Sequence, residues 1–345
     1  MSPLKRLELL GRRFLTWSTA SLLGAPRRKV DLSEQPRILV VRLDERVGNL
    51  VLLTPLLTTL TERFPGAVVE VLGYAKTRAL LEHHPAVSAV HAFDKRSLFS
   101  SHGPLGIFGF LRARAFDLVI DASNPTDPSF TQALITRFAG ARYSVGPAQG
   151  AFERLYTSPV AISNEGHEID LRLQLARDLP GGPTLTHAPT LGSQGEPSST
   201  VRQFVKALPT FVVLNLGARI KEKWLAPETY AELAEAVMKR GFACVLTWGP
   251  VEKALATQTL QRTPGAKLAP PTNLADLAYV LRNAKAVVTC DTGPMHIAVA
   301  VGTPTCAIFV STDPARYGYD SPPHRAVESR DPAWRVRVFA WLETL

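Results

Sequence analysis

A group of polar residues that could bind an anion follows an apolar run in AVVTCDTGPMHIAVAVGTPTCAIFVSTDP, residues 286–314. The run reads as a buried strand that ends at Asp291, with a turn at Thr292 and Gly293. A proline then suits the first position of a helix, and His296 lies in the first turn of that helix. Backbone N–H groups at a helix N-terminus bind anions, so a turn with a hydroxyl and a glycine predicts a site for a diphosphate.

Two further loops with charged residues follow apolar runs in the same half of the chain. They are NLGARIKEKW, residues 215–224, and TWGPVEK, residues 247–253. The first supplies Gly217, Arg219, Lys221 and Lys223, and the second supplies Glu252. The carboxyl ends of parallel strands meet at one edge of a sheet, so we expect these loops to converge on the diphosphate site. Cations would balance the phosphate charge, and the carboxylate would accept hydrogen bonds from ribose or base.

A third charged loop lies within VRLDERVGNLVLLTP, residues 41–55. The segment predicts the end of a buried strand, then a loop with carboxylates and guanidiniums, and then the start of a helix. The polar residues of the loop are Arg42, Asp44, Glu45, Arg46 and Asn49, with a turn at Gly48. Because strand-to-helix loops at the carboxyl edge carry the chemistry of α/β proteins, we expect this loop to face a substrate.

Short apolar runs alternate with segments of helical length, which is typical of parallel sheets buried on both faces. Strands are predicted at 38–42, 67–72, 87–92, 117–121, 142–146, 211–215, 242–247, 285–290 and 304–309. Helices are predicted at 49–63, 75–83, 105–114, 128–139, 227–239, 251–262, 273–282 and 293–301. Residues 180–200 are rich in Pro, Gly, Ser and Thr and predict a linker. The pattern therefore predicts two α/β domains with a ligand cleft between them.

Several catalytic and metal-binding motifs are absent from the sequence. It has no G-x-x-x-x-G-K-[ST] phosphate loop, no G-x-G-x-x-G after a strand, no H-E-x-x-H and no convincing G-x-S-x-G. Cys244, Cys290 and Cys306 lie in apolar runs without metal-ligand spacing, so we expect buried thiols. These absences argue against classical kinases, dehydrogenases and hydrolases, and we predict neither a bound metal nor a cofactor.

Most of the net charge of +9 lies at the N-terminus. Residues 1–30 contain seven Lys or Arg and one acidic residue, which leaves only +3 for the remaining chain. This distribution argues against a domain that binds nucleic acid. Apolar residues recur here at helical spacing, but no apolar run reaches the ~20 residues of a transmembrane helix. We expect a basic amphipathic helix over 4–23 that lies either on anionic lipid or on the protein itself.

The order of these motifs resembles glycosyltransferase family 9, the ADP-heptose:lipopolysaccharide heptosyltransferases and their relatives. The resemblance covers roughly residues 37–320 and is strongest in RLDERVGNLVLLTPLLTTLTERFPGAVVEVL, WGPVEK and DTGPMHIAVAVGTP with the later STDP. It implies a GT-B fold, in which two Rossmann-like domains with parallel sheets face a cleft. It also implies metal-free, inverting transfer of a heptose from a nucleotide donor to a lipid-linked core sugar.

The resemblance assigns the nucleotide sugar, expected to be ADP-heptose, to the second domain. It implies that Asp291, Thr292, Gly293 and His296 line the donor site, with Lys223 at phosphate and Glu252 at the nucleoside. Lys223 is favoured over Lys221 because it has the family's spacing to Glu228. Gly217 and the following alanine replace hydroxyl residues of the family, so contacts there are expected from backbone amides.

The first domain departs from the family at its general base. The family has Gly-Asp at the start of its first helix, and that aspartate is taken as the base for the acceptor hydroxyl. Counting back from Pro55, the corresponding position here is Asn49, directly after Gly48. An amide cannot take the proton, so we predict that Asp44 acts as the base and that Asn49 hydrogen-bonds to the acceptor.

We therefore expect a basic N-terminal extension (1–36), an acceptor-binding domain (37–180), a linker (181–200) and a nucleotide-sugar-binding domain (201–345). The expected activity is transfer of heptose from ADP-heptose to a lipid-linked lipopolysaccharide core acceptor. The expected location is cytoplasmic, at the inner face of the inner membrane. Asn49 leaves open a non-catalytic family member that binds a nucleotide sugar or glycan. A third alternative is an unrelated nucleotide-binding α/β enzyme.

Overall fold

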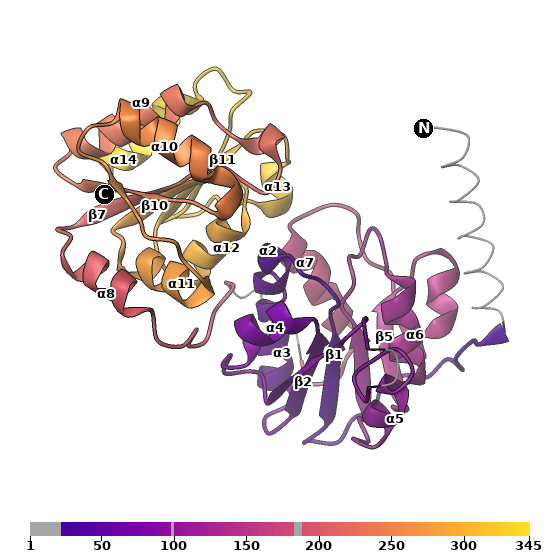
Figure 1. The fold of residues 1–345 in the computed structure, drawn as a ribbon. Coiled ribbons are helices and arrows are strands. Elements are labelled where there is room, and N and C mark those ends of the chain that lie inside the picture. The colour runs from indigo at the N-terminus through magenta and orange to yellow at the C-terminus, as the bar shows by residue number, and fades with distance from the viewer. Residues whose placement is uncertain (1–21, 98–99, 183–187) are drawn as a thin grey trace, which may run out of the picture. The chain divides into compact units, whose positions relative to one another are not determined.

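The computed structural model describes residues 22–97, 100–182 and 188–345, and the chain divides into two compact units (Figure 1). The first unit contains the described residues up to Glu45 and those from Leu53 to the gap at 183–187. The second contains Arg46–Leu52 together with Ala188–Leu345. The amphipathic helix predicted over 4–23 lies almost entirely outside the described residues.

A six-stranded parallel sheet forms the centre of the first unit, with strand order β3-β2-β1-β4-β5-β6. Its strands are β1 (Arg37–Val41), β2 (Val68–Gly73), β3 (Ala89–Ala92), β4 (Leu118–Asp121), β5 (Tyr143–Pro147) and β6 (Ser158–Val160). Its helices are α3 (Thr54–Arg63), α4 (Ala75–Leu81), α5 (Ile107–Arg112), α6 (Phe130–Phe138) and α7 (Glu168–Leu173), with 3₁₀ turns at Gly150–Leu155 and Gln174–Ala176. In the central strand β1 every residue after Arg37 is buried, as expected for a sheet covered on both faces.

The second unit contains another six-stranded parallel sheet, with strand order β12-β11-β10-β7-β8-β9. Its strands are β7 (Phe211–Asn215), β8 (Ala243–Thr247), β9 (Lys267–Leu268), β10 (Ala286–Cys290), β11 (Thr305–Phe309) and β12 (Arg325–Glu328). Its helices are α2 (Val47–Val51), α8 (Ser199–Lys206), α9 (Pro227–Lys239), α10 (Lys253–Arg262), α11 (Leu274–Asn283), α12 (Gly293–Ala300), α13 (Pro314–Tyr317) and α14 (Trp334–Glu343), with 3₁₀ turns at Lys221–Lys223 and Pro250–Glu252.

The three cysteines lie in the core of the second unit, as predicted. Cys244, Cys290 and Cys306 are each fully buried, and each is a free thiol that forms no disulfide bond. Burial raises the pKa of Cys244 and Cys306 to about 12 and the pKa of Cys290 to about 11. These thiols are therefore protonated at neutral pH and behave as small apolar side chains.

The helix predicted over 49–63 differs from the observed structure. It is two helices, because α2 ends at Val51 and α3 begins at Thr54. Pro55 lies in the first turn of α3, where its missing N–H removes the bond that would continue the preceding helix. Several elements had no prediction, namely β6, α7, α8, β9, α13, β12 and α14. Within the described ranges, no helix combines the length and hydropathy needed to cross a bilayer.

Candidate functional site

The three polar strand ends of the second half lie at one edge of the second sheet. Strand β7 lies between β10 and β8, and Asn215 at the end of β7 pairs in register with Thr247 at the end of β8. The loops that carry Lys223, Glu252 and Asp291 all leave the sheet at this edge. The parallel topology thus brings together residues that are up to 76 positions apart, such as Asn215 and Asp291.

Asp291 is the centre of a buried polar cluster at this edge. It is 7 % exposed and accepts hydrogen bonds from the ammonium of Lys223 and from the Thr312 hydroxyl, the latter over 2.6 Å. Lys223 belongs to the 3₁₀ turn after β7, and its side chain is only partly exposed. The neighbouring Arg219 and Lys221 are exposed, and Lys221 lies 5.8 Å above the ring of Trp224. Of the three predicted cations, Lys223 is therefore the one held in the cluster.

Glu252 lies in a backbone cradle made by two glycines. A Cβ atom on Gly217 would lie 2.5 Å from Glu252 Cγ, and a Cβ atom on Gly249 would lie 2.6 Å from Glu252 Oε2. Gly217 also has a φ of +69°, and its N–H donates to the Tyr230 hydroxyl over 2.9 Å. Burial raises the pKa of Glu252, because the residue is only 6 % exposed and its charged form is poorly solvated.

The turn after β10 leaves the first helical N–H groups of α12 without a side-chain cap. Thr292 is the residue before the helix, and its side chain makes no capping hydrogen bond. Gly293 is the first helical residue, so it places no side chain of its own over the helix N-terminus. N–H groups without a cap at a helix N-terminus lack hydrogen-bond acceptors, so they favour the binding of an anion. The structure is thus consistent with the diphosphate site predicted at this turn.

His296 faces inward from the first turn of α12. It is 4 % exposed, and its Nδ1 lies 2.9 Å from the hydroxyl of Tyr319. Gly48, on helix α2 of the same unit, lies so close that a Cβ atom there would be 2.6 Å from His296 Cδ2. The structure therefore brings together two predicted site residues from distant parts of the chain. Tyr319 was not predicted, because nothing in its local sequence indicates that it contacts the histidine.

The charged loop after β1 has its own ion pair in the first unit. Asp44 is 9 % exposed and accepts from Arg42 Nη2 over 2.9 Å, while Arg42 Nη1 donates to the carbonyl of Ala122 over 2.6 Å. Glu45 is exposed and lies 3.6 Å from Lys95. Asn49 is partly buried in α2 and belongs to the second unit. The two predicted catalytic residues, Asp44 and Asn49, thus lie on different units.

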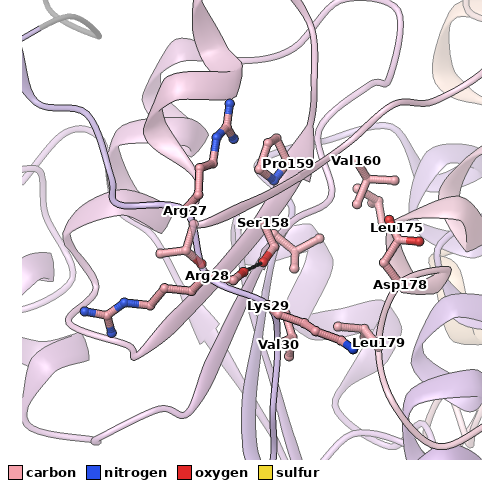
Figure 2. A pocket seen from close by; sticks show the side chains of 12 residues that line it. Arg27, Arg28, Lys29, Val30, Ser158, Pro159, Val160, Leu175, Asp178 and Leu179 are labelled. Atoms are coloured by element: carbon pink, nitrogen blue, oxygen red, sulfur yellow. Dashed lines mark hydrogen bonds between the residues drawn. The ribbon is translucent and has the colours of Figure 1, made fainter.

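A cavity of about 460 Å³ lies elsewhere, at the outer edge of the first sheet (Figure 2). Residues 27–30 run beside β6, where Arg28 N donates to the Thr157 carbonyl over 2.9 Å. Residues 175–179 form the opposite wall, and Figure 2 shows Lys29 extending toward Leu179 and Asp178. None of the residues predicted for the site lines this cavity. Its lining residues with buried side chains, such as Val160 and Leu175, make its floor apolar.

The protein-family comparison matches residues 107–333 to the model of glycosyltransferase family 9 (heptosyltransferase). The chain belongs to glycosyltransferase family 9. This match covers well over half of the 345 residues and includes all of the polar cluster around Asp291. It begins after the charged loop at 42–49, so that loop is not part of the matched region. The family is one of sugar-transferring enzymes, and this protein is a glycosyltransferase of the heptosyltransferase type.

Relatives of this family 9 glycosyltransferase support the assignment. Lipopolysaccharide heptosyltransferase 3 of Escherichia coli is 26 % identical over 284 residues, which cover 77 % of this chain and 81 % of that protein. The structure of a family 9 glycosyltransferase from Veillonella parvula has a TM-score of 0.75 at 19 % identity, covering 92 % of this chain and 91 % of that one. The E. coli heptosyltransferase WaaC, solved with ADP, has a TM-score of 0.70 at 23 % identity, covering 88 % and 98 %.

These structural similarities show the fold. Both units are Rossmann-like domains with an all-parallel sheet, and the chain has the GT-B fold that the sequence predicted. Among the described residues, no three histidine, cysteine, aspartate or glutamate side chains gather in an arrangement that could hold a metal ion. The positive charge within the polar cluster at the edge of the second sheet comes from Lys223.

Proposed function

We propose that this glycosyltransferase moves a heptose from ADP-heptose to a lipopolysaccharide core acceptor, with inversion at the anomeric carbon. The proposal draws on the name of the E. coli relative, a lipopolysaccharide heptosyltransferase, and on the ADP bound to its structural neighbour WaaC. In an inverting transfer the acceptor oxygen attacks the anomeric carbon from the side opposite the leaving ADP. The enzyme must therefore stabilise the charge on the departing diphosphate and remove a proton from the acceptor.

The observation that carries this proposal is the Lys223–Asp291 ion pair beside the uncapped start of α12. Asp291 holds the lysine in place before any donor binds, and Thr312 holds Asp291, because the carboxylate accepts from Lys223 and from the Thr312 hydroxyl. A preorganised ammonium and a set of helical N–H groups suit a diphosphate whose charge increases as the sugar leaves. In this arrangement Lys223 bonds to phosphate, and Thr292 and Gly293 contribute at the turn.

The cradle around Glu252 suits the nucleoside end of the donor. Its carboxylate accepts hydrogen bonds from the ribose hydroxyls, and the glycines at 217 and 249 keep the side chain in one position. Arg219 and Lys221 are exposed on the loop after β7, which also carries Gly217, and they add positive potential around the donor. His296, held by Tyr319, completes the donor side of the proposed site.

We assign the acceptor side to the loop at 42–49, with Asp44 as general base and Asn49 as a hydrogen-bonding partner of the acceptor. The ion pair with Arg42 has two consequences for Asp44. It keeps the carboxylate ionised, which is the form that accepts a proton, and it also makes that carboxylate a weaker base. The outcome of replacing Asp44 by asparagine therefore decides between a base and a residue that only shapes the loop.

The basic N-terminal segment suits attachment to the cytoplasmic face of the inner membrane. Seven of the first 30 residues are Lys or Arg, and a lipid-linked acceptor would hold the enzyme near the same surface. This part of the proposal comes from sequence, since it concerns residues 4–23.

Calorimetric titration with ADP, with and without EDTA, tests the donor site. We expect metal-independent binding, weakened by about 1–3 kcal/mol in Lys223→Ala, because a charge-assisted hydrogen bond is lost. Lys239→Ala is the matched control, since Lys239 is an exposed lysine on α9 that lies 3.7 Å from Glu235. Binding that disappears with EDTA, or that is insensitive to Lys223→Ala, would contradict the proposed donor site.

A further inference from the structure

Three buried polar side chains form a line across the second sheet, next to the proposed donor turn. Asn215 at the end of β7 is 5 % exposed, and Thr247 of β8 and Thr289 of β10 are each 1 % exposed. The Thr247 hydroxyl donates to Asn215 Oδ1 over 3.2 Å, and Asn215 Nδ2 donates to Thr289 Oγ1 over 3.1 Å. Buried polar groups cost free energy unless they are paired, and in this line each one has a partner.

The donors and acceptors give this line a direction. Thr289 accepts from Asn215 Nδ2, and its own hydroxyl proton goes to the carbonyl of Cys290 over 3.0 Å. The hydroxyl of Thr292 lies 3.4 Å from Thr289 Oγ1. A hydroxyl has one proton, so Thr292 donates in this contact while Thr289 bonds to the Cys290 carbonyl, and Thr289 donates when its hydroxyl turns to Thr292. In both cases the Asn215 amide fixes the Thr289 oxygen that contacts Thr292.

We infer that Asn215 is a positioning residue for the nucleotide donor, acting through Thr289 on Thr292. Thr292 is partly exposed at the start of α12, so its own hydroxyl proton can go to a phosphate oxygen when Thr289 donates to it. Thr289 keeps its bond from Asn215 in that state, so the amide holds Thr292 in place through Thr289. The inference rests on the proposed binding of ADP-heptose at this edge. Asn215 itself need not contact any atom of the nucleotide sugar.

Replacing Asn215 by leucine removes both hydrogen bonds of the amide with little change in volume. The Thr289 hydroxyl then lacks the amide that fixes it, so it holds Thr292 less firmly in the orientation that donates to phosphate. We expect the Kd for ADP and the KM for the sugar donor to rise together by about 10-fold, the size of one weakened hydrogen bond to a charged group. Thr247→Val should have a smaller effect, because the Asn215–Thr289 bond is left intact.

A double-mutant cycle separates positioning from general destabilisation. Thr292→Val removes the hydroxyl at the end of the line, so adding Asn215→Leu to it should not weaken ADP binding further. Thr303→Val is the matched control, since Thr303 is 3 % exposed and its hydroxyl donates to the Leu281 carbonyl over 2.8 Å. It should lower stability as Asn215→Leu does and leave ADP affinity unchanged.

If Asn215→Leu does not fold, Thr289→Val enters the same cycle, because it interrupts the line at the next residue. Additive effects of the two substitutions on ADP affinity would overturn the inference, as would a loss of affinity in Thr303→Val equal to that in Asn215→Leu. Failure of the wild-type protein to bind ADP would overturn the proposed function and this inference with it. Binding by the wild type with an additive cycle would overturn this inference alone.

Discussion

Replacing Gly217 by alanine tests the cradle around Glu252. The substitution adds one methyl group at a position with a φ of +69°, a conformation that costs an L-residue about 1–2 kcal/mol. The new Cβ would also lie 2.5 Å from Glu252 Cγ and 3.2 Å from the Trp224 ring. Glu252 must move away to relieve this contact, at a further cost of about 1–3 kcal/mol for an overpacked site. We therefore expect a total loss of about 2–5 kcal/mol in the free energy of unfolding.

Gly241→Ala isolates the backbone part of this cost. Gly241 follows α9 with a φ of +82°, and no heavy atom lies within 4 Å of a Cβ placed there. This variant should lose only about 1–2 kcal/mol, and its affinity for ADP should equal that of the wild type. The difference between the two variants is then the cost of displacing Glu252.

Tryptophan fluorescence in a denaturant titration measures these losses of unfolding free energy in the second unit, which contains both glycines. Of the five tryptophans, Trp224, Trp248, Trp334 and Trp341 belong to the second unit, so the signal reports mainly on that unit. Calorimetry with ADP measures the functional consequence. Equal stability and equal ADP affinity in Gly217→Ala and Gly241→Ala would refute the reasoning, because they would show that the contact with Glu252 does not constrain the site.

Three further predictions concern the first unit and the N-terminus. Burial raises the pKa of Asp121 from 3.8 to about 6, against the opposing hydrogen bond from Tyr156, so the native state binds this proton more tightly than the unfolded state. Stability should therefore fall by up to about 3 kcal/mol as pH rises from 4 to 6, and this part should vanish in Asp121→Asn, measured by urea denaturation followed by circular dichroism. Asp44→Asn should slow heptose transfer by about 10²–10⁴-fold with ADP binding intact; full activity in this variant, with Asn49→Asp more active than wild type, would contradict a base at 44. Removal of residues 1–30 should abolish co-sedimentation with anionic vesicles, and equal sedimentation of both proteins would count against membrane attachment.

The parts of the proposed donor site that could be predicted from sequence are those where a short apolar run ends in polar residues. The apolar runs before Asp291 and Glu252 are continuous and short. The local sequence therefore predicts both that they are strands and where each strand ends. The resemblance to the family favoured Lys223 over Lys221 by its spacing to Glu228, and the structure places Lys223, not Lys221, against Asp291. Its role toward a bound donor remains a prediction.

What could not be predicted depends on which strands are neighbours. The line from Thr247 through Asn215 to Thr289 exists only because β7 lies between β8 and β10, an order that no local pattern specifies. Tyr319 lies in a loop after α13, and its partner His296 lies in α12, which begins before β11. No periodic pattern in the sequence connects these two residues. The break between α2 and α3 had a local signal in Pro55, although the apolar pattern continues through it.

The membership of Arg46–Leu52 in the second unit changes how the two halves are joined covalently. The backbone passes from one unit to the other after Glu45, returns after Leu52, and passes again between the described residues 182 and 188. Proteolysis of the 181–200 segment would therefore give two polypeptides, and α2 would remain covalently attached to the first unit although it belongs to the second. A gene fragment that starts at Ala188 would encode the second unit without α2 and thus without the Gly48 that lies against His296. Recombination between family members at that segment would join residues 188–345 of one protein to the α2 of the other.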